Sequence, residues 1–198
     1  KINIDDLKWK YLNSDGDFRN KEIVELRDEA DIIITNPPFS LFREFVDWII
    51  EGGKKFIIIG NMDAITYKQI FPLIRDNKIW LGAGLNDGRN EWYEVPANSE
   101  KFHKEENGKK YAFVKKTIWF TNIDHGRRHM PLELMSMSDV IKFVTKKPFE
   151  KFDNYDAINI EEVKHIPSDY DGVMGVPISF LNKYSPEQFE LVGSNRGV

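Results

Sequence analysis

The 198-residue sequence contains no cysteine, which excludes disulfide bridges and thiolate metal sites and favours a cytoplasmic setting. No apolar run approaches the roughly 20 residues that a membrane-spanning helix needs, and residues 1–6 do not resemble a signal peptide. Hydrophobic residues make up 41% of the chain, which is enough to bury a core. These absences indicate a globular protein that neither spans a membrane nor depends on disulfides.

The net charge of −4 is distributed unevenly along the chain. Residues 101–151 contain 12 Lys or Arg and 6 Asp or Glu, whereas residues 1–100 contain 13 and 18, and residues 152–198 contain 3 and 8. Because phosphate binding depends on local charge, the middle segment is the predicted contact for a nucleic-acid backbone. Its candidate contacts are three pairs of neighbouring cations: Lys109, Lys110, Lys115, Lys116, Arg127 and Arg128. A solvated surface strand would show the same pattern.

Strands and helices are expected to alternate through the first half of the sequence. Apolar or alternating runs predict strands at residues 8–12, 30–35, 55–59 and 78–81. Periodic segments with stop signals predict helices at residues 20–29, 41–50 and 66–75, the last interrupted near Pro72. This alternation indicates a parallel α/β sheet with helices on both faces.

The second half carries weaker signals. The β-rich run 111–122 is expected to pair antiparallel at a sheet edge, residues 91–95 and 173–181 are strand-like, and residues 185–187 resemble a single helical turn. We therefore assign residues 1–125 to a core of sheet and helices, and residues 126–198 to an extension packed on that core.

Asn36, Pro37, Pro38 and Phe39 directly follow a β-branched run and precede the predicted helix at 41–50. Each proline lacks a backbone donor and has a fixed φ, so the turn presents rigidly placed carbonyl acceptors. Asn36 adds an amide oxygen and Phe39 a flat apolar ring. Many such turns only end an element, but ligands of open α/β sheets bind beyond the carboxyl ends of the strands. The arrangement suits methyl transfer to an amino nitrogen of a planar base.

Two other groups of side chains carry weaker signals. His125 and His129 are four residues apart, but no third ligand recurs nearby, so we expect no metal site and assign them to structural or phosphate contacts. Trp119 and Phe120 offer a second stacking face for a base, although core packing explains either ring equally well.

Several stretches together resemble a known family. Gly16-Asp17-Phe18, followed by a strand that ends in Asn36-Pro37-Pro38-Phe39, is similar to consecutive motifs of amino-methylating, S-adenosylmethionine-dependent DNA methyltransferases. Further stretches resemble the EcoRI-type adenine-specific methylases: residues 39–44, 59–61, 64–68, 119–122, 154–159 and 175–181. The resemblance extends from about residue 13 to residue 193. It implies a doubly wound, mostly parallel, Rossmann-like methyltransferase sheet.

The resemblance also implies roles for individual residues. An adenine flipped out of double-stranded DNA would donate its amino hydrogens to Asn36 and Pro37 and stack on Phe39, with Pro38 completing the rigid turn. Asp17, Phe18 and Asn36 would line the S-adenosylmethionine site. A cognate restriction endonuclease that acts on the same DNA site is the expected partner.

One part of the family pattern has no counterpart in the sequence. The glycine-rich cofactor loop belongs upstream of Gly16, and nothing before Lys8 supplies it, so we expect that the first βαβ unit is missing. Two rival functions stay open. The same tetrapeptide can hold a glutamine side-chain amide, as in a protein methyltransferase, or the chain is a non-catalytic DNA-binding fragment.

Overall fold

Strands and helices alternate in the first half of the molecule, as predicted. The computed structural model describes residues 11–83, 92–113 and 116–194. The elements of the first half, in chain order, are α1 (Lys21–Glu29), β1 (Ile32–Thr35), the 3-10 turn η2 (Phe39–Leu41), α2 (Phe42–Glu51), β2 (Lys55–Asn61), the 3-10 turn η3 (Met62–Thr66), α3 (Ile70–Arg75) and β3 (Trp80–Leu81). Of the predicted strand 8–12, residues 8–10 lie outside the described residues and residues 11–12 form no strand.

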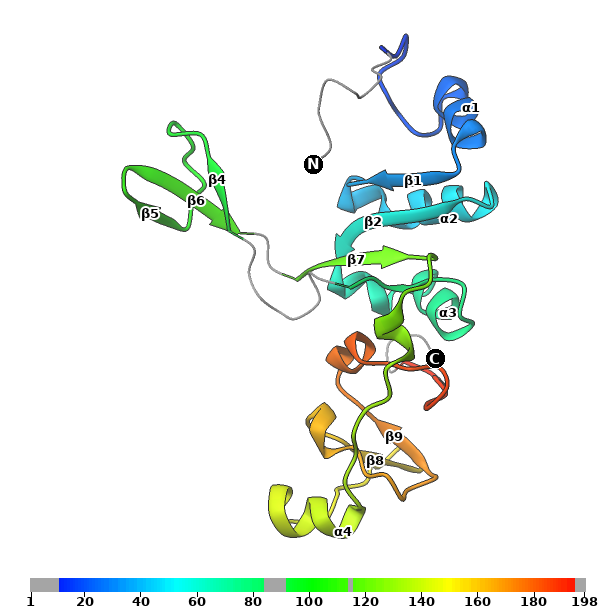
Figure 1. Ribbon diagram of the computed structural model, residues 1–198, viewed down its shortest axis with the longest axis vertical. Helices are drawn as coiled ribbons and strands as arrows, with labels where there is room; N and C mark the ends of the chain where they lie inside the picture. Colours follow the sequence, from blue (N-terminus) through cyan, green and yellow to red (C-terminus); the bar gives the residue numbers. More distant parts are fainter. Residues whose placement is uncertain (1–10, 84–91, 114–115, 195–198) are drawn as a thin grey trace.

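The main sheet is mixed. Its strand order is β1-β2-β7-β3, where β7 comprises Thr117–Thr121 (Figure 1). β1 and β2 pair parallel through the α2 crossover, as a βαβ unit requires. β2 is flanked on both sides and alternates buried and less buried residues, which explains its long run of isoleucines. The class is therefore α/β, with a sheet that is only partly parallel.

The position predicted for the antiparallel strand was wrong. β7 does pair antiparallel, but it lies between β2 and β3 rather than at an edge of the sheet. The run predicted as one strand at 111–122 divides into β6 (Lys109–Phe113) and β7, which belong to different sheets. Ile118 and Phe120 are fully buried, and such side chains favour an interior strand over an edge.

The third helix starts later than predicted. Residues 62–66 form η3 instead, and α3 begins at Ile70, so Pro72 lies in its first turn. Proline is tolerated there because amides of the first turn have no partner within the helix. The predicted stop after α2 is confirmed, since Gly53 adopts the left-handed φ of 62° that follows many helices.

A small three-stranded antiparallel sheet stands apart from the main sheet (Figure 1). Its order is β4-β6-β5, with β4 at Trp92–Val95 and β5 at Lys104–Glu106. The rings of Trp92, His103 and Phe113 pack together on it, with Trp92 and Phe113 centroids 4.8 Å apart. The sequence predicted β4 but not the separate sheet.

The C-terminal half is built from short elements around a second hydrophobic cluster. These elements are the 3-10 turn η5 (Gly126–His129), α4 (Met137–Asp139), the π-helical turn η6 (Val140–Thr145), β8 (Ala157–Asn159), the 3-10 turn η7 (Val163–His165), β9 (Val173–Gly175) and the 3-10 turn η8 (Ile178–Asn182). Leu181 and Leu191 pack against both this cluster and the main core. None of the helices in the described part of the chain is long and apolar enough to cross a membrane.

His129 links the chain after β7 to the C-terminal segment. Its Nε2 lies 2.9 Å from both carboxylate oxygens of Asp124, and its Nδ1 lies 2.6 Å from Oε1 of Glu187. These hydrogen bonds, to Asp124 above all, raise the pKa of His129 above its usual 6.5. They likewise lower the pKa values of Asp124 and Glu187. The imidazolium thus joins two segments that are 63 positions apart in the sequence.

This junction predicts a pH-dependent stability. A raised histidine pKa contributes stability that is fully present below pH 6.5 and is lost as the pH rises through the raised value. Melting temperature measured against pH should therefore fall more steeply on the alkaline side for the native protein than for His129→Gln. His103→Gln, on the separate sheet, serves as the control. Parallel curves for all three proteins would contradict the assignment.

Candidate active site

The predicted site lies where two parallel strands end. Asn36 follows β1 directly, and Asn61 is the last residue of β2. Because β1 and β2 run parallel, both asparagines lie at the same edge of the sheet (Figure 1). This is the edge at which open α/β sheets bind ligands.

The turn after β1 presents polar and aromatic groups to the surface. Asn36 is exposed, Pro37 is buried, and the Phe39 side chain is 39% exposed. The Leu41 amide donates to the Pro38 carbonyl at 3.0 Å, which starts η2. Outside the strand ladder, no hydrogen bond among the described residues engages the Asn36 side chain or the Pro37 carbonyl. The Asn36 side chain and the Phe39 ring are therefore exposed to a ligand, and the buried Pro37 contributes a carbonyl without a partner among the described residues.

Phe42 anchors this turn on the sheet. Its ring is 2% exposed and lies against Gly60 of β2 and Phe120 of β7, with the two ring centroids 5.0 Å apart. Phe120 is fully buried in the core, so its ring does not reach a ligand and our stacking assignment for it does not fit. Trp119, the other stacking candidate, is half-buried on the opposite face of β7.

The residues that follow β2 lie at the same end of the sheet as the turn at residues 36–39. The Asn61 side-chain oxygen accepts from the Asp63 amide at 2.8 Å and caps η3. Asp63 in turn pairs with Lys116, whose Nζ lies 2.9 and 3.0 Å from its two oxygens. The sequence did not predict this cap or this ion pair, although an asparagine at a strand end is a common capping signal.

Asp17 is held by a neighbouring arginine that the sequence analysis had not assigned a role. Its carboxylate accepts from the Arg19 amide at 2.9 Å and from the guanidinium at 2.9 and 2.6 Å. The side-chain hydrogen bond from Arg19 lowers the pKa of Asp17 to about 2. Asp17 is therefore ionised at neutral pH, and its side chain is 29% exposed. A ligand amino group would have to share or replace the arginine.

Phe18 ties this loop to α2. Its ring is 8% exposed and packs edge-on against Phe45 at 5.2 Å and Trp48 at 5.7 Å. The Arg19 guanidinium also lies 3.6 Å from Glu44 of the same helix. The structure therefore connects Asp17 and Phe18 to the turn at residues 36–39 through α2, which begins three residues after Phe39.

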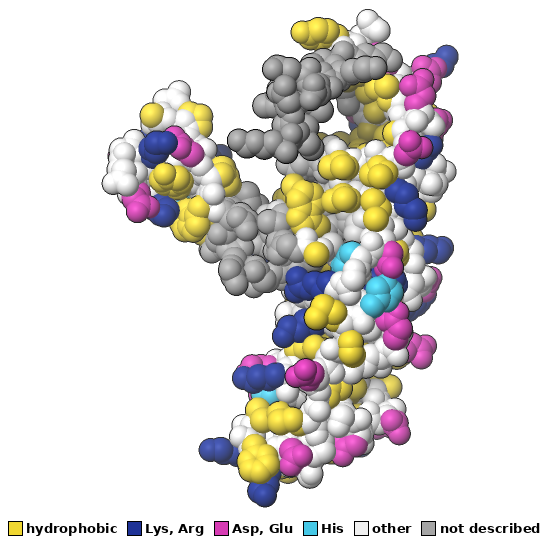
Figure 2. All heavy atoms as spheres, viewed as in Figure 1, with side chains coloured by type: hydrophobic (Ala, Val, Ile, Leu, Met, Phe, Trp, Pro, Cys, Tyr) yellow, Lys and Arg dark blue, Asp and Glu magenta, His cyan; other side chains and the backbone are white. Residues whose placement is uncertain are grey.

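Hydrophobic side chains gather over β1 and β2 on the face shown in Figure 2. Ile32 and Ile34 of β1 are 51% and 69% exposed, and β1 ends the strand order of the described sheet. Isoleucines in a sheet are normally covered, so this face is open to further protein or ligand.

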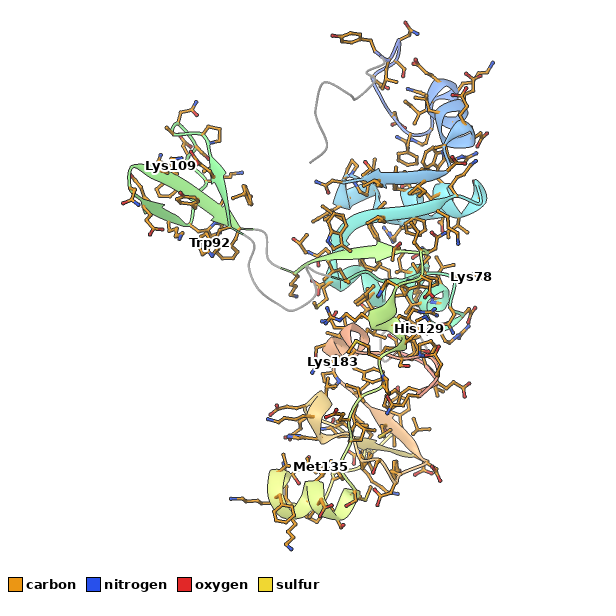
Figure 3. The ribbon with its side chains drawn as sticks, in the orientation of Figure 1. Lys78, Trp92, Lys109, His129, Met135 and Lys183 are labelled. Atoms are coloured by element: carbon orange, nitrogen blue, oxygen red, sulfur yellow. The ribbon has the colours of Figure 1, made fainter. Side chains whose placement is uncertain are left out.

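The predicted phosphate contacts are not equally accessible. Lys109 pairs with Glu94 at 2.8 Å, Lys110 donates to the Ser99 carbonyl at 3.0 Å, and Lys116 pairs with Asp63. Lys115 lies outside the described residues. Lys109 lies on the separate sheet, away from the main body (Figure 3). The exposed ion pairs of Lys109 and Lys116 are weak and exchangeable, so these two lysines remain candidates, together with the half-buried Lys110.

Arg128 is mostly buried and contacts other side chains of the protein. Its side chain is 13% exposed, its guanidinium stacks 4.0 Å from the Trp80 ring, and NH2 donates to Asn77 at 2.6 Å. His125 is likewise engaged, with Nε2 2.9 Å from the Leu81 carbonyl. Arg127 is half-buried, and no ion pair among the described residues engages it. Within the described residues, no group of three or more His, Cys, Asp or Glu could hold a metal ion.

A turn that follows the first strand of a βαβ unit is the arrangement that the resemblance to amino-directed methyltransferases implies. The chain belongs to the EcoRI family of adenine-specific methyltransferases, because the family model described as "Adenine-specific methyltransferase EcoRI" matches residues 1–198. The resemblance drawn from the motifs is thereby confirmed.

Three curated relatives are similar over most of this chain. The type II methyltransferase M.EcoRI of Escherichia coli is 45% identical over 202 residues, covering 100% of this chain and 60% of the relative. M.MgeORF184P of Mycoplasma genitalium is 40% identical, covering 91% and 57%, and M.MpnI of Mycoplasma pneumoniae is 37% identical, covering 97% and 61%. The chain thus spans about three fifths of the length of these relatives. No solved structure matches it.

The contact between Phe42 and β2 predicts that Gly60 tolerates no side chain. A Cβ there would meet Phe42 at 2.5 Å and Phe120 at 2.8 Å. Gly60→Ala should therefore cost about 1 to 3 kcal/mol of unfolding free energy and displace the turn at residues 36–39. Gly126→Ala, where a Cβ meets nothing within 4 Å, is the matched control. Equal chemical-denaturation midpoints for the two variants would contradict this packing.

The two neighbouring arginines should behave differently. Arg128→Ala should cost roughly 1 to 3 kcal/mol of stability, because it removes a mostly buried, stacked guanidinium. Arg127→Ala should leave stability unchanged and reduce the slope of log affinity against log salt for DNA by about 0.9. Thermal melts and salt-dependent binding separate the two effects. A reduced slope only in Arg128→Ala would reverse the assignment.

Proposed function

We propose that the protein transfers a methyl group from S-adenosylmethionine to the exocyclic amino group of an adenine in DNA. The observation that carries the proposal is the exposed Asn36-Pro37-Pro38-Phe39 turn at the carboxyl end of β1, in a chain of the EcoRI methyltransferase family.

Asn36 and Pro37 hold the amino group. The side-chain oxygen of Asn36 and the Pro37 carbonyl both lack a hydrogen-bond partner outside the ladder of the described strands. When Asn36 and Pro37 accept hydrogen bonds from both N–H groups of the adenine amino group, they favour a pyramidal nitrogen. The lone pair of this nitrogen then points away from the ring. Pro38 keeps its carbonyl engaged with Leu41, so the turn is already in place before the base arrives.

Phe39 receives the ring of the base. The edges of an adenine inside a duplex are covered, so the base must leave the stack at a cost of a few kcal/mol. A ring that is 39% exposed next to the two acceptors offers the stacking surface that compensates for this cost. Trp119 is a second candidate surface, on β7, which is separated from β1 by β2.

S-adenosylmethionine supplies an electrophilic methyl group on a sulfonium sulfur. With that cofactor bound, the adenine nitrogen held by Asn36 and Pro37 would take up the methyl carbon as the S–C bond breaks, and would then lose a proton to water. Positioning by Asn36 and Pro37 is the main catalytic device, so the chemistry needs no histidine base.

The Asp17 loop fits the adenosine end of that cofactor. An ionised, partly exposed carboxylate accepts from the amino group of an adenine ring, and Phe18 lies beside it. Arg19 occupies the carboxylate in the structure, so we infer that this arginine shifts when the cofactor binds.

We also infer a doubly wound, Rossmann-like sheet. Ile32 and Ile34 lie exposed on β1. In such a fold a helix or further strand would cover these side chains. The assignment of residues 1–125 to the catalytic core and 126–198 to a DNA-recognising extension goes with this inference.

The rival functions predict different substrates. A glutamine-amide methyltransferase would methylate a peptide, and a non-catalytic fragment would bind DNA without methylating it. Family membership and the basic segment 101–151 favour DNA. A cytoplasmic enzyme paired with a restriction endonuclease of the same specificity is the biological setting that we propose.

The proposal predicts that Asn36→Ala in the full-length protein lowers adenine methylation by about 100-fold or more, because the reacting nitrogen is no longer held. DNA affinity and melting temperature should be unchanged, since Asn36 is exposed and makes no described side-chain hydrogen bond. Tritiated-methyl transfer to duplex DNA measures the rate.

Asn98→Ala, which changes another exposed asparagine in the turn after β4, is the matched control. Near-native transfer by Asn36→Ala would refute the catalytic role. Methylation of a glutamine peptide in place of DNA would establish the rival function instead.

A further inference from the structure

The helix formed by α4 and η6 has an unusual outer face. Val140 is fully buried, and Ile141 and Val144 are half-buried, so these residues form the inner face. Lys142, Phe143 and Lys146 are exposed on the other side, and the Phe143 side chain is 63% exposed. A large aromatic ring on the cationic face of a helix is not explained by core packing.

The π-helical turn creates this arrangement. The Lys146 amide donates to the Ile141 carbonyl at 2.9 Å, an i to i+5 bond, and Lys146 ends the turn with a left-handed φ of 56°. Lys142 and Lys146 are both exposed, as is Phe143, which lies between them in the sequence. Single π turns are uncommon in proteins as a whole, and those that occur are often found at functional sites.

The charged side chains of this segment are all positive. Residues 140–149 contain three lysines and no acidic residue. Lys147 is paired with Glu150 and Glu161, at 3.5 and 3.3 Å. No ion pair among the described residues engages Lys142 or Lys146, and the Lys142 ammonium lies 4.8 Å from the centroid of the Phe143 ring. Two exposed cations, one of them next to an exposed ring, complement phosphates and a groove.

We propose that this helix is a second DNA-contacting surface, with Lys142 and Lys146 on backbone phosphates and Phe143 inserted into the groove between them. The inference rests on the proposed function only in taking DNA as the partner. α4 and Met135, which shortly precedes it, lie toward the end of the molecule opposite α1 (Figures 1 and 3). The helix would therefore contact DNA away from the flipped base.

The lysines are tested by salt-dependent binding of the full-length protein to duplex DNA. Lys142→Gln and Lys146→Gln should each reduce the magnitude of the slope of log affinity against log salt by about 0.9. Lys78→Gln, an exposed lysine beside α3 (Figure 3), should leave the slope unchanged. If the lysines only complement the end of the helix, both variants would lower the melting temperature and leave the slope intact, which would overturn the proposal.

The ring is tested separately. Phe143→Ala should weaken DNA binding by about tenfold at every salt concentration without changing the slope, whereas Phe143→Leu should retain most of the affinity. Equal affinity for Phe143→Ala and the native protein would overturn the role of the ring.

The outcomes distinguish this inference from the proposed function. Native binding and methylation, with unaltered slopes in both lysine variants, refute the second surface alone. A native protein that binds DNA but methylates no adenine refutes the proposed activity, while reduced slopes in the lysine variants would still support this surface. A native full-length protein that binds no DNA refutes both.

Discussion

The close contact of Phe42 with Gly60 is the packing constraint on which the site depends. Because Gly60 has no side chain, the Phe42 ring reaches the backbone of β2 and the buried Phe120 of β7. This contact fixes the start of α2 on the sheet, and the residues just before it are the turn at 36–39. Asn36 and Phe39 can therefore stay exposed, since neighbouring buried residues hold the backbone that presents them.

The second part of the site is attached to the same helix. Phe18 packs on Phe45 and Trp48 of α2. Arg19 contacts both Asp17 and Glu44. The loop before α1 and the turn after β1 are therefore both held by α2. One amphipathic helix thus positions the acceptors for the base and the carboxylate proposed for the cofactor.

Sequence patterns predicted the structural features that neighbouring residues determine, and they missed the features that depend on partners far away in the sequence. The β-branched run, the prolines and Gly53 were enough to predict β1, the turn at 36–39 and the end of α2. The insertion of β7 between β2 and β3 was not predictable, because its antiparallel pairing depends on residues some 60 positions away. The charges of Arg128 and Lys116 suggested phosphate contacts, but charge alone does not show that Trp80 stacks on one and Asp63 pairs with the other.

The central claim is that the turn at the end of β1 receives a base taken out of duplex DNA. The most direct test replaces the base to be methylated with 5-iodouracil, crosslinks it to the full-length protein with light and maps the attached peptide by mass spectrometry. We expect a crosslink in the peptide that contains Phe39. Crosslinks only in the β4-β6-β5 sheet or in the α4–η6 helix would contradict it.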